Sequence, residues 1–67
     1  MEDRWKFILR EEIACLKSEI RANPHSKGVY VQHSFVRGYI YGLHTAGIIN
    51  TEYWLALEKE INNIVFK

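Results

Sequence analysis

The one thiol and the three imidazoles of this sequence could bind a metal ion or take part in catalysis: Cys15, His25, His33 and His44. Zinc sites draw on Cys and His ligands at short characteristic spacings, and these positions match none of them. His33 and His44 fall on one side of a predicted helix, but eleven residues, about three turns, separate them. One ion cannot reach both unless the helix is broken or a second chain contributes. We therefore predict no metal site and no cofactor.

Nucleophilic and acid–base chemistry have no better support. Cys15 is the only cysteine, and no histidine is placed by sequence to activate its thiol, so we expect it to pack as a small apolar side chain. The carboxylate pairs Glu11–Glu12 and Glu58–Glu60 would need a cleft to work as acid and base. Three short helices hardly provide a cleft, so we expect solvated charges and predict that the chain is not an enzyme.

The composition is that of a folded protein outside the membrane. Of the 67 residues, 48% are hydrophobic and 25% are charged, which argues against intrinsic disorder. No apolar run is long enough to span a membrane, and the N-terminal residues MEDRWKF lack the apolar segment of a signal peptide. We therefore expect a cytoplasmic protein that does not bind membranes.

The small size of the chain points to a partner. We expect residues 1–67 to form one domain, and a domain near this size buries only about 60% of the surface that its unfolded chain exposes. A single cysteine allows no internal disulfide to stabilise it. The remaining stabiliser is a protein surface, so we expect a homodimer or docking on a larger protein. The net charge of +1 is far from that of a dedicated nucleic-acid binder.

The first predicted helix runs from about Asp3 to Ala22. Its apolar residues recur at spacings of three and four, which forms one stripe on a helix. They are Trp5, Leu9, Ile13, Leu16 and Ile20. Asp3 is placed to act as the N-cap, and Asn23-Pro24 ends the helix because the residue before proline avoids the α region. Residues 23–28 are expected to form a loop.

The segment from about Val29 to Ala46 admits two interpretations. Its β-branched and aromatic residues suit strands, so a β-hairpin over residues 29–41 is one alternative. As a helix from Gln32 onward, with a looser start, it gathers its apolar residues on one half of the helical wheel, and we favour this interpretation. Those residues are Phe35, Val36, Tyr39, Ile40, Leu43 and Ala46.

A third helix is expected after a short turn. Gly47 suits the left-handed position that closes a helix, and Asn50 is a good N-cap. Ile49 and Trp54 then stand as a hydrophobic staple around this cap. Because the connection is short, the second and third helices should form an antiparallel αα-hairpin. The predicted fold class is all-α, with the first helix packed across the hairpin or exchanged with a second copy.

Small residues recur at every fourth position of the second helix, beside its apolar face. They are Ser34, Gly38, Gly42 and Ala46. A glycine inside a helix costs about 0.5–1 kcal/mol relative to alanine, so the two glycines need a compensating role. Small residues at this spacing let another backbone approach closely. We predict a close helix contact here, made by this chain or, alternatively, by a second copy or a target protein.

A second stripe of the same helix lies away from its predicted core. It consists of Tyr30, His33, Arg37, Tyr41 and His44. Tyrosine and arginine are over-represented among the side chains that dominate protein interfaces, and residues 23–50 contain no acid. We predict a protein-binding face, with a plain solvated surface as the alternative. Leu55 and Phe66 lie off the apolar face of the third helix and are further candidates for contact.

A basic strip on the first helix is the one argument for nucleic acid. It consists of Lys6, Arg10, Lys17 and Arg21, which could follow a line of phosphates. The strip also flanks an apolar seam whose other edge carries Glu12 and Glu19, a pattern typical of interhelical ion pairs. We therefore favour packing and keep a small nucleic-acid-binding transcriptional regulator as the second candidate.

Residues 36–61, VRGYIYGLHTAGIINTEYWLALEKEI, resemble the helical-hairpin pattern of many short proteins from phages that infect Gram-positive bacteria. The matching features are Gly38-Tyr39, Gly42-Leu43, Gly47-Ile48 and the acidic, apolar third helix, which together cover under half of the chain. The resemblance implies a small accessory or anti-defence protein, encoded by a phage or mobile element, that binds and blocks a host protein. With it, the leading expectation is a non-enzymatic protein-interaction module.

Overall fold

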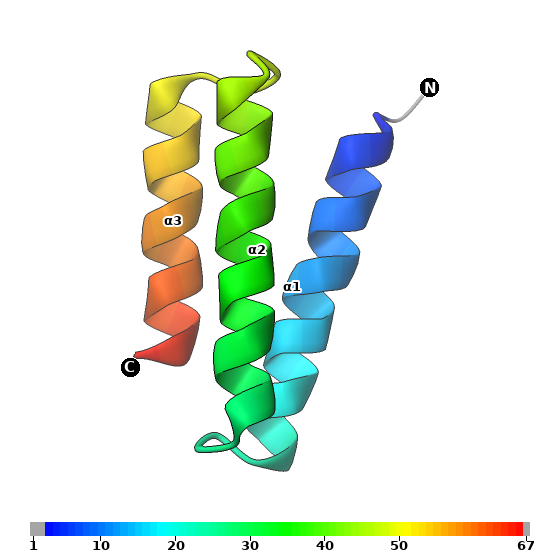
Figure 1. Ribbon diagram of the computed structural model, residues 1–67, viewed down its shortest axis with the longest axis vertical. Coiled ribbons are helices and arrows are strands. Elements are labelled where there is room, and N and C mark those ends of the chain that lie inside the picture. The colour runs from blue at the N-terminus through cyan, green and yellow to red at the C-terminus, as the bar shows by residue number, and fades with distance from the viewer. Residues whose placement is uncertain (1–2, 67) are drawn as a thin grey trace.

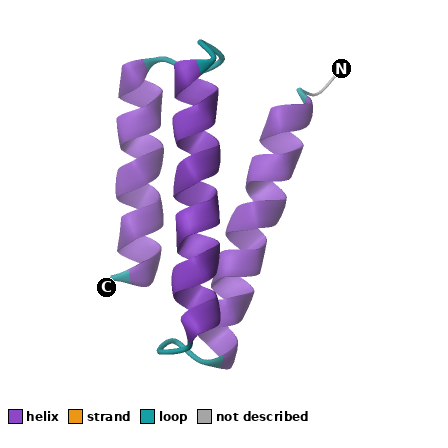
Figure 2. Cartoon of the chain, viewed as in Figure 1, coloured by secondary structure: helices purple, strands orange, loops and turns teal. Residues whose placement is uncertain are grey.

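The chain folds into three helices, and the computed structural model describes residues 3–66 (Figure 1). The helices are α1 (Arg4–Ala22), α2 (Lys27–Thr45) and α3 (Thr51–Val65). Figure 2 shows only helices and loops over this range, so the all-α prediction is confirmed and the β-hairpin alternative for residues 29–41 is wrong. The predicted antiparallel pairing of the second and third helices is also confirmed.

The first helix buries the stripe that its sequence spacing predicts. Leu9 and Leu16 are buried, and Trp5, Ile13 and Ile20 are half-buried against the same core. The helix ends where Asn23 turns away in an extended conformation, while its N–H still donates to the carbonyl of Glu19. Asp3 stands at the N-cap position, but its side chain accepts no capping hydrogen bond there.

The second helix is the centre of the molecule, and it starts at Lys27 rather than with the looser beginning expected near Val29. Its buried side chains are Val29, His33, Val36, Ile40 and Leu43. Phe35 and Ala46 were expected on the core side but are exposed, with 64% of Phe35 open to solvent. The arc of α2 that is buried is therefore narrower than half of the helix.

The turn from α2 to α3 follows the chemistry of its residues. Gly47 has φ 78°, the left-handed conformation that an L residue adopts only at a cost, and the N–H of Ile48 donates to the carbonyl of Leu43. The Oδ1 atom of Asn50 accepts from the N–H of Tyr53 at 2.8 Å, so the predicted N-cap is confirmed. Ile49, just before the cap, is buried, while Trp54 is half-buried and packs on the core.

The three helices form a slab instead of a closed triangle. The principal extents are 34 × 23 × 15 Å, and α1 and α3 each pack on α2 while touching one another little. In Figure 1, α1 lies against α2 near their connecting loop and diverges from it toward its own N-terminal end. One face of α2 is consequently left without a covering element. Within residues 3–66, no helix is both long and apolar enough to cross a membrane.

Candidate interaction surface

Polar contacts join α2 to α3 along their length. The Nε2 atom of His33 lies 2.9 Å from Oδ1 of Asn62, and Nη2 of Arg37 lies 3.7 Å from Oε1 of Glu58. His33 is only 7% exposed, and Phe66 packs edge-on against its ring at 5.3 Å between centroids. The expectation that His33 belongs to an exposed stripe is therefore wrong, because its ring closes the junction between the two helices.

His44 is likewise occupied inside the chain. Its ring stacks on Trp54 with 4.6 Å between centroids and 15° between planes, and its Nε2 atom is hydrogen-bonded to Oγ1 of Thr51 at 2.9 Å. Tyr41 packs on the same indole at 5.8 Å but stays 57% exposed. These contacts leave Tyr41 as the side chain of this cluster that is most available to a partner.

Exposed side chains lie along the side of the slab where Arg37 of α2 meets Glu58 of α3, and we call this surface the hairpin face. It consists of Tyr30, Arg37 and Tyr41 from α2 with Leu55 and Phe66 from the α3 side. Their exposed fractions are high for residues of this kind, at 53% for Tyr30, 53% for Leu55 and 62% for Phe66. The alignment of α2 with α3 sets Tyr41 level with Trp54 and the neighbouring Leu55. The ion pair between Arg37 and Glu58 is thus bordered by aromatic and aliphatic side chains of the two helices.

The small-residue strip is open along its whole length. Ser34, Gly38, Gly42 and Ala46 are all exposed. Apart from the adjoining residues and the nearby backbone of α2 itself, no atom lies within 4 Å of a Cβ added at Gly38 or Gly42. The prediction that another helix of this chain packs here is therefore wrong. The alternative, contact with a second copy or another protein, stays a prediction.

Sequence reasoning missed the exposed apolar residues next to that strip. Phe35 is the most exposed large hydrophobic residue in the described part of the chain, and 53% of Val31 is open to solvent. Both lie on the side of α2 that adjoins Gln32 and Tyr39, because residues three and four apart share a helix face. Phe35 was predicted to lie in the core because it is hydrophobic and falls on the same half of the helical wheel as Tyr39. Their spacing gave no sign that Tyr39 would be half-buried and Phe35 exposed.

The side of α2 that carries Gln32 and Tyr39 is hydrogen-bonded to α1. Nε2 of Gln32 donates to Oε2 of Glu12 at 2.6 Å and to the carbonyl of Glu12 at 3.1 Å. The Tyr39 hydroxyl donates to the carbonyl of Trp5 at 3.4 Å. Glu12 is thus engaged with α2 instead of the basic strip on its own helix.

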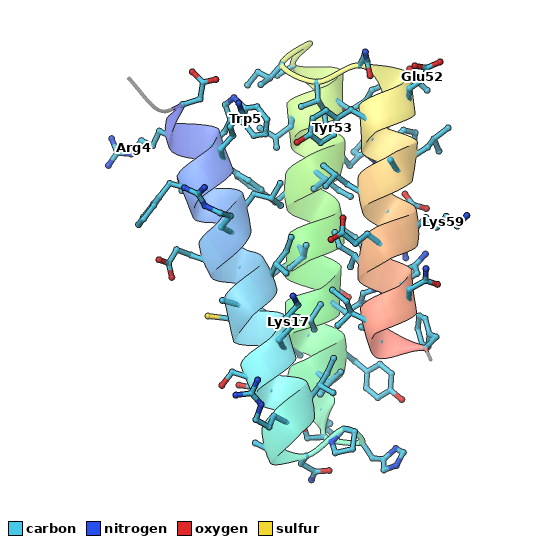
Figure 3. All side chains as sticks on the ribbon, turned by 180° about the vertical axis from the view of Figure 1, so that it is seen from behind. Arg4, Trp5, Lys17, Glu52, Tyr53 and Lys59 are labelled. Atoms are coloured by element: carbon cyan, nitrogen blue, oxygen red, sulfur yellow. The ribbon has the colours of Figure 1, made fainter. Side chains whose placement is uncertain are left out.

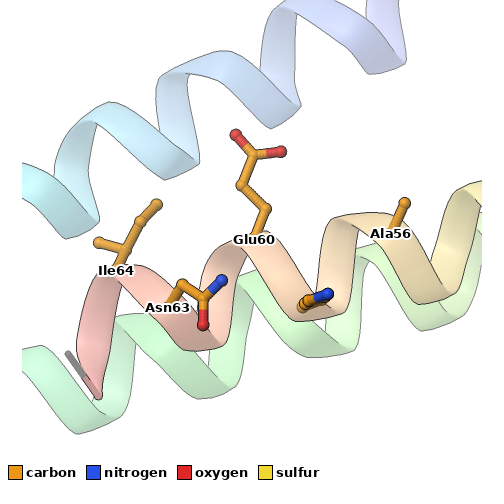
Figure 4. A pocket seen from close by; sticks show the side chains of 5 residues that line it. Ala56, Glu60, Asn63 and Ile64 are labelled. Carbon is orange, nitrogen blue, oxygen red and sulfur yellow. The ribbon is translucent and has the colours of Figure 1, made fainter.

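The opposite side of the slab carries the basic strip and two open depressions. Figure 3 shows Trp5 and Tyr53 turned toward one another across α1 and α3, with their ring centroids 6.3 Å apart. A depression of about 240 Å³ is lined by Lys17, Ile20, Arg21 and Ile64. A second, of about 420 Å³, lies on α3 (Figure 4), where Glu60 points toward α1. Lys59 also lines it, so this depression carries charges of both signs.

The described histidine, cysteine and acidic side chains that could bind a metal ion lie apart from one another. Within residues 3–66, no set of three or more His, Cys, Asp and Glu side chains lies together in a way that could hold a metal ion. Cys15 is exposed, so the expectation that it packs as a small apolar side chain is wrong. Its thiol is unpaired in the described structure.

Comparisons with known proteins add no relative. Neither the protein-family models, nor the curated proteins, nor the solved structures match this chain. The exposed surfaces of the molecule are therefore what indicates its function.

Proposed function

We propose that this chain is a non-enzymatic protein-binding module whose contact surface is the hairpin face. The observation that supports this proposal most is the exposure of Tyr41, Leu55 and Phe66 on one side of a chain this small. Aromatic side chains and arginine supply most of the energy at protein interfaces. Tyr41 packs on Trp54, and a tyrosine has only two side-chain torsions, so its ring would lose little freedom on binding.

The ion pair gives this face its specificity for a partner. Arg37 is half exposed, with 50% of its side chain open to solvent, and Glu58 is more covered at 27%. A partner carboxylate could compete for the guanidinium, which offers five donors in a fixed plane. The partner surface that fits best is therefore apolar with an acidic group near its centre.

The resemblance of residues 36–61 to short phage proteins supports a more specific form of this proposal. In this form the module is encoded by a phage or mobile element, works in the cytoplasm of the host cell, and blocks a host defence protein by occupying its surface. The size of the chain suits this role, because a specific interface takes only about 800 Å² from each partner.

A capture experiment with matched variants tests the proposal. The tagged protein would be used to capture binding proteins from an extract of a Gram-positive host, alongside Tyr41→Ala, Leu55→Ala and the control Phe7→Ala. Phe7 is 52% exposed on α1, so this control removes an equally accessible ring away from the hairpin face. We expect one protein to be retained by wild type and Phe7→Ala but lost with the other two variants. Equal retention by all four proteins would refute the hairpin face as the contact surface.

The basic strip of α1 supports the second candidate, a small nucleic-acid-binding regulator. Its supporting observation is that Lys17 and Arg21 line one depression together. Binding through phosphate contacts weakens steeply as salt is raised. A gel-shift titration at low salt tests it: no shift of either DNA or RNA removes this candidate, and a shift that is lost with Lys17→Ala and Arg21→Ala supports it.

A further inference from the structure

The outer side of α2 that faces away from α3 has no partner in this chain. It presents Val31 and Phe35 as exposed apolar side chains and Gly38 and Gly42 as open backbone, and we call these four residues the Phe35 edge. None of them carries a charge, and Ser34 and Ala46 on its margins are uncharged as well. Most exposed helix faces in water carry charged side chains, so this one is unusual.

The whole molecule also exposes more surface than its mass requires. Its accessible surface is 4985 Å², whereas a compact monomer of 7.9 kDa is expected to expose about 4,400 Å². The radius of gyration is 12.0 Å, against about 11 Å for a compact chain of this length. The excess, about 600 Å² over the whole slab, means that the molecule has surface to spare for an interface, which takes ~800 Å² from each partner.

From these observations we infer that the Phe35 edge is the contact between two copies of this chain, which cross α2 on α2 at the glycines. An interface with two-fold symmetry brings each surface against its own copy. A charged face would then meet like charge, whereas an uncharged face meets itself without repulsion. The lack of charge on this edge therefore favours a second copy over a partner selected by charge.

The glycines define how the copies meet. Since a Cβ at Gly38 or Gly42 would touch nothing within this chain, the lack of side chains there serves no internal packing. In the dimer the two α2 backbones approach closely at these positions, and the Phe35 ring of each copy covers the neighbouring helix. Tyr41, three residues after Gly38, borders this contact, whereas Leu55 and Phe66 lie on the α3 side and stay free in both copies.

Measurement of mass by light scattering over a dilution series, together with helicity by circular dichroism, tests the inference. We expect wild type to be a dimer that dissociates on dilution. In Gly38→Leu the new Cβ has no atom within 4 Å to clash with, and leucine favours a helix more than glycine does. Helicity should therefore be retained while the dissociation constant rises at least tenfold. Leu55→Ala, on the hairpin face, should leave the dissociation constant unchanged. A wild-type monomer at every concentration overturns the inference.

Nuclear Overhauser contacts between labelled and unlabelled copies locate the interface independently of any substitution. We expect contacts from the ring protons of Phe35 in one copy to the α protons of Gly38 and Gly42 in the other. A dimer that lacks these contacts, or one that Gly38→Leu leaves intact, shows that the copies meet elsewhere and overturns the inference. Capture experiments with Leu55→Ala report on the hairpin face alone, so the two proposals can fail separately.

Discussion

His33 Nε2 lies 2.9 Å from Asn62 Oδ1, and this pair joins the first half of α2 to the last turns of α3. The amide oxygen can only accept, so the imidazole donates from Nε2. Phe66 covers the ring edge-on, and the histidine is the buried polar side chain among the core residues of the described chain. A residue with the chemistry of a ligand thus stabilises the packing of the hairpin.

Substitution of His33 by alanine is expected to destabilise the fold by about 1–3 kcal/mol. The change leaves the half-buried amide of Asn62 without its partner and removes a ring from the core. Urea denaturation measures the loss as a lower midpoint. His25→Ala, in the exposed loop before α2, is the control and should leave the midpoint unchanged.

Loss of the Asn50 cap should lower the free energy of unfolding by about 0.5–2 kcal/mol, because the N–H of Tyr53 loses its acceptor in Asn50→Ala. Asp3 holds the same position in α1 without a side-chain hydrogen bond. Asp3→Ala should therefore change stability by less than Asn50→Ala. Thermal melts of both variants make the comparison, and equal losses would contradict it.

Substitution of Gly47 by alanine should destabilise the protein by roughly 1–2 kcal/mol. The cause is its φ of 78°, since an L residue in the left-handed region is strained even where space is open. Gly28→Ala is the matched comparison inside a helix. Its Cβ would meet Oε2 of Glu19 at 2.7 Å, but this atom ends a flexible side chain and can move aside. Calorimetry should therefore show a loss for Gly47→Ala and no comparable loss for Gly28→Ala.

Truncation of Ile61 should remove a large part of the free energy of unfolding. Ile61 is fully buried, and an isoleucine-to-alanine change in a core costs about 2–5 kcal/mol. A chain of this length has a total stability of only about 3–10 kcal/mol. Leu55→Ala, six residues earlier on the exposed side of α3, should lose little because 53% of Leu55 is already open to solvent. The urea midpoint of unfolding, followed by helicity at 25 °C, distinguishes the two variants.

Local residue chemistry predicted the elements of the fold well. Asn23-Pro24, Gly47 and Asn50 mark the helix ends because each acts through its own backbone or its nearest neighbours. The spacing of Leu9 and Leu16 likewise predicted a buried stripe on α1. These features need no knowledge of where the other helices lie.

The surfaces were harder to predict because they depend on the arrangement of the helices. In a slab, α2 is covered on two flanks and open on the third, so its buried arc is decided by where α1 and α3 lie. Phe35 falls just outside that arc and is exposed, whereas His33 falls inside it and finds Asn62. A prediction from hydrophobicity places Phe35 in the core and His33 on the surface, which is wrong for both residues. The spacing of Gly38 and Gly42 predicted a close helix contact, but no helix of this chain lies there and the strip is open.

The short connections on either side of α2 also affect how quickly the chain folds. Because α1 and α3 each pack mainly on the helix next to them in the sequence, most contacts close short loops. Proteins with such local contacts have low contact order and fold in microseconds to milliseconds. A newly made copy would therefore reach its helical form well before it meets a second molecule.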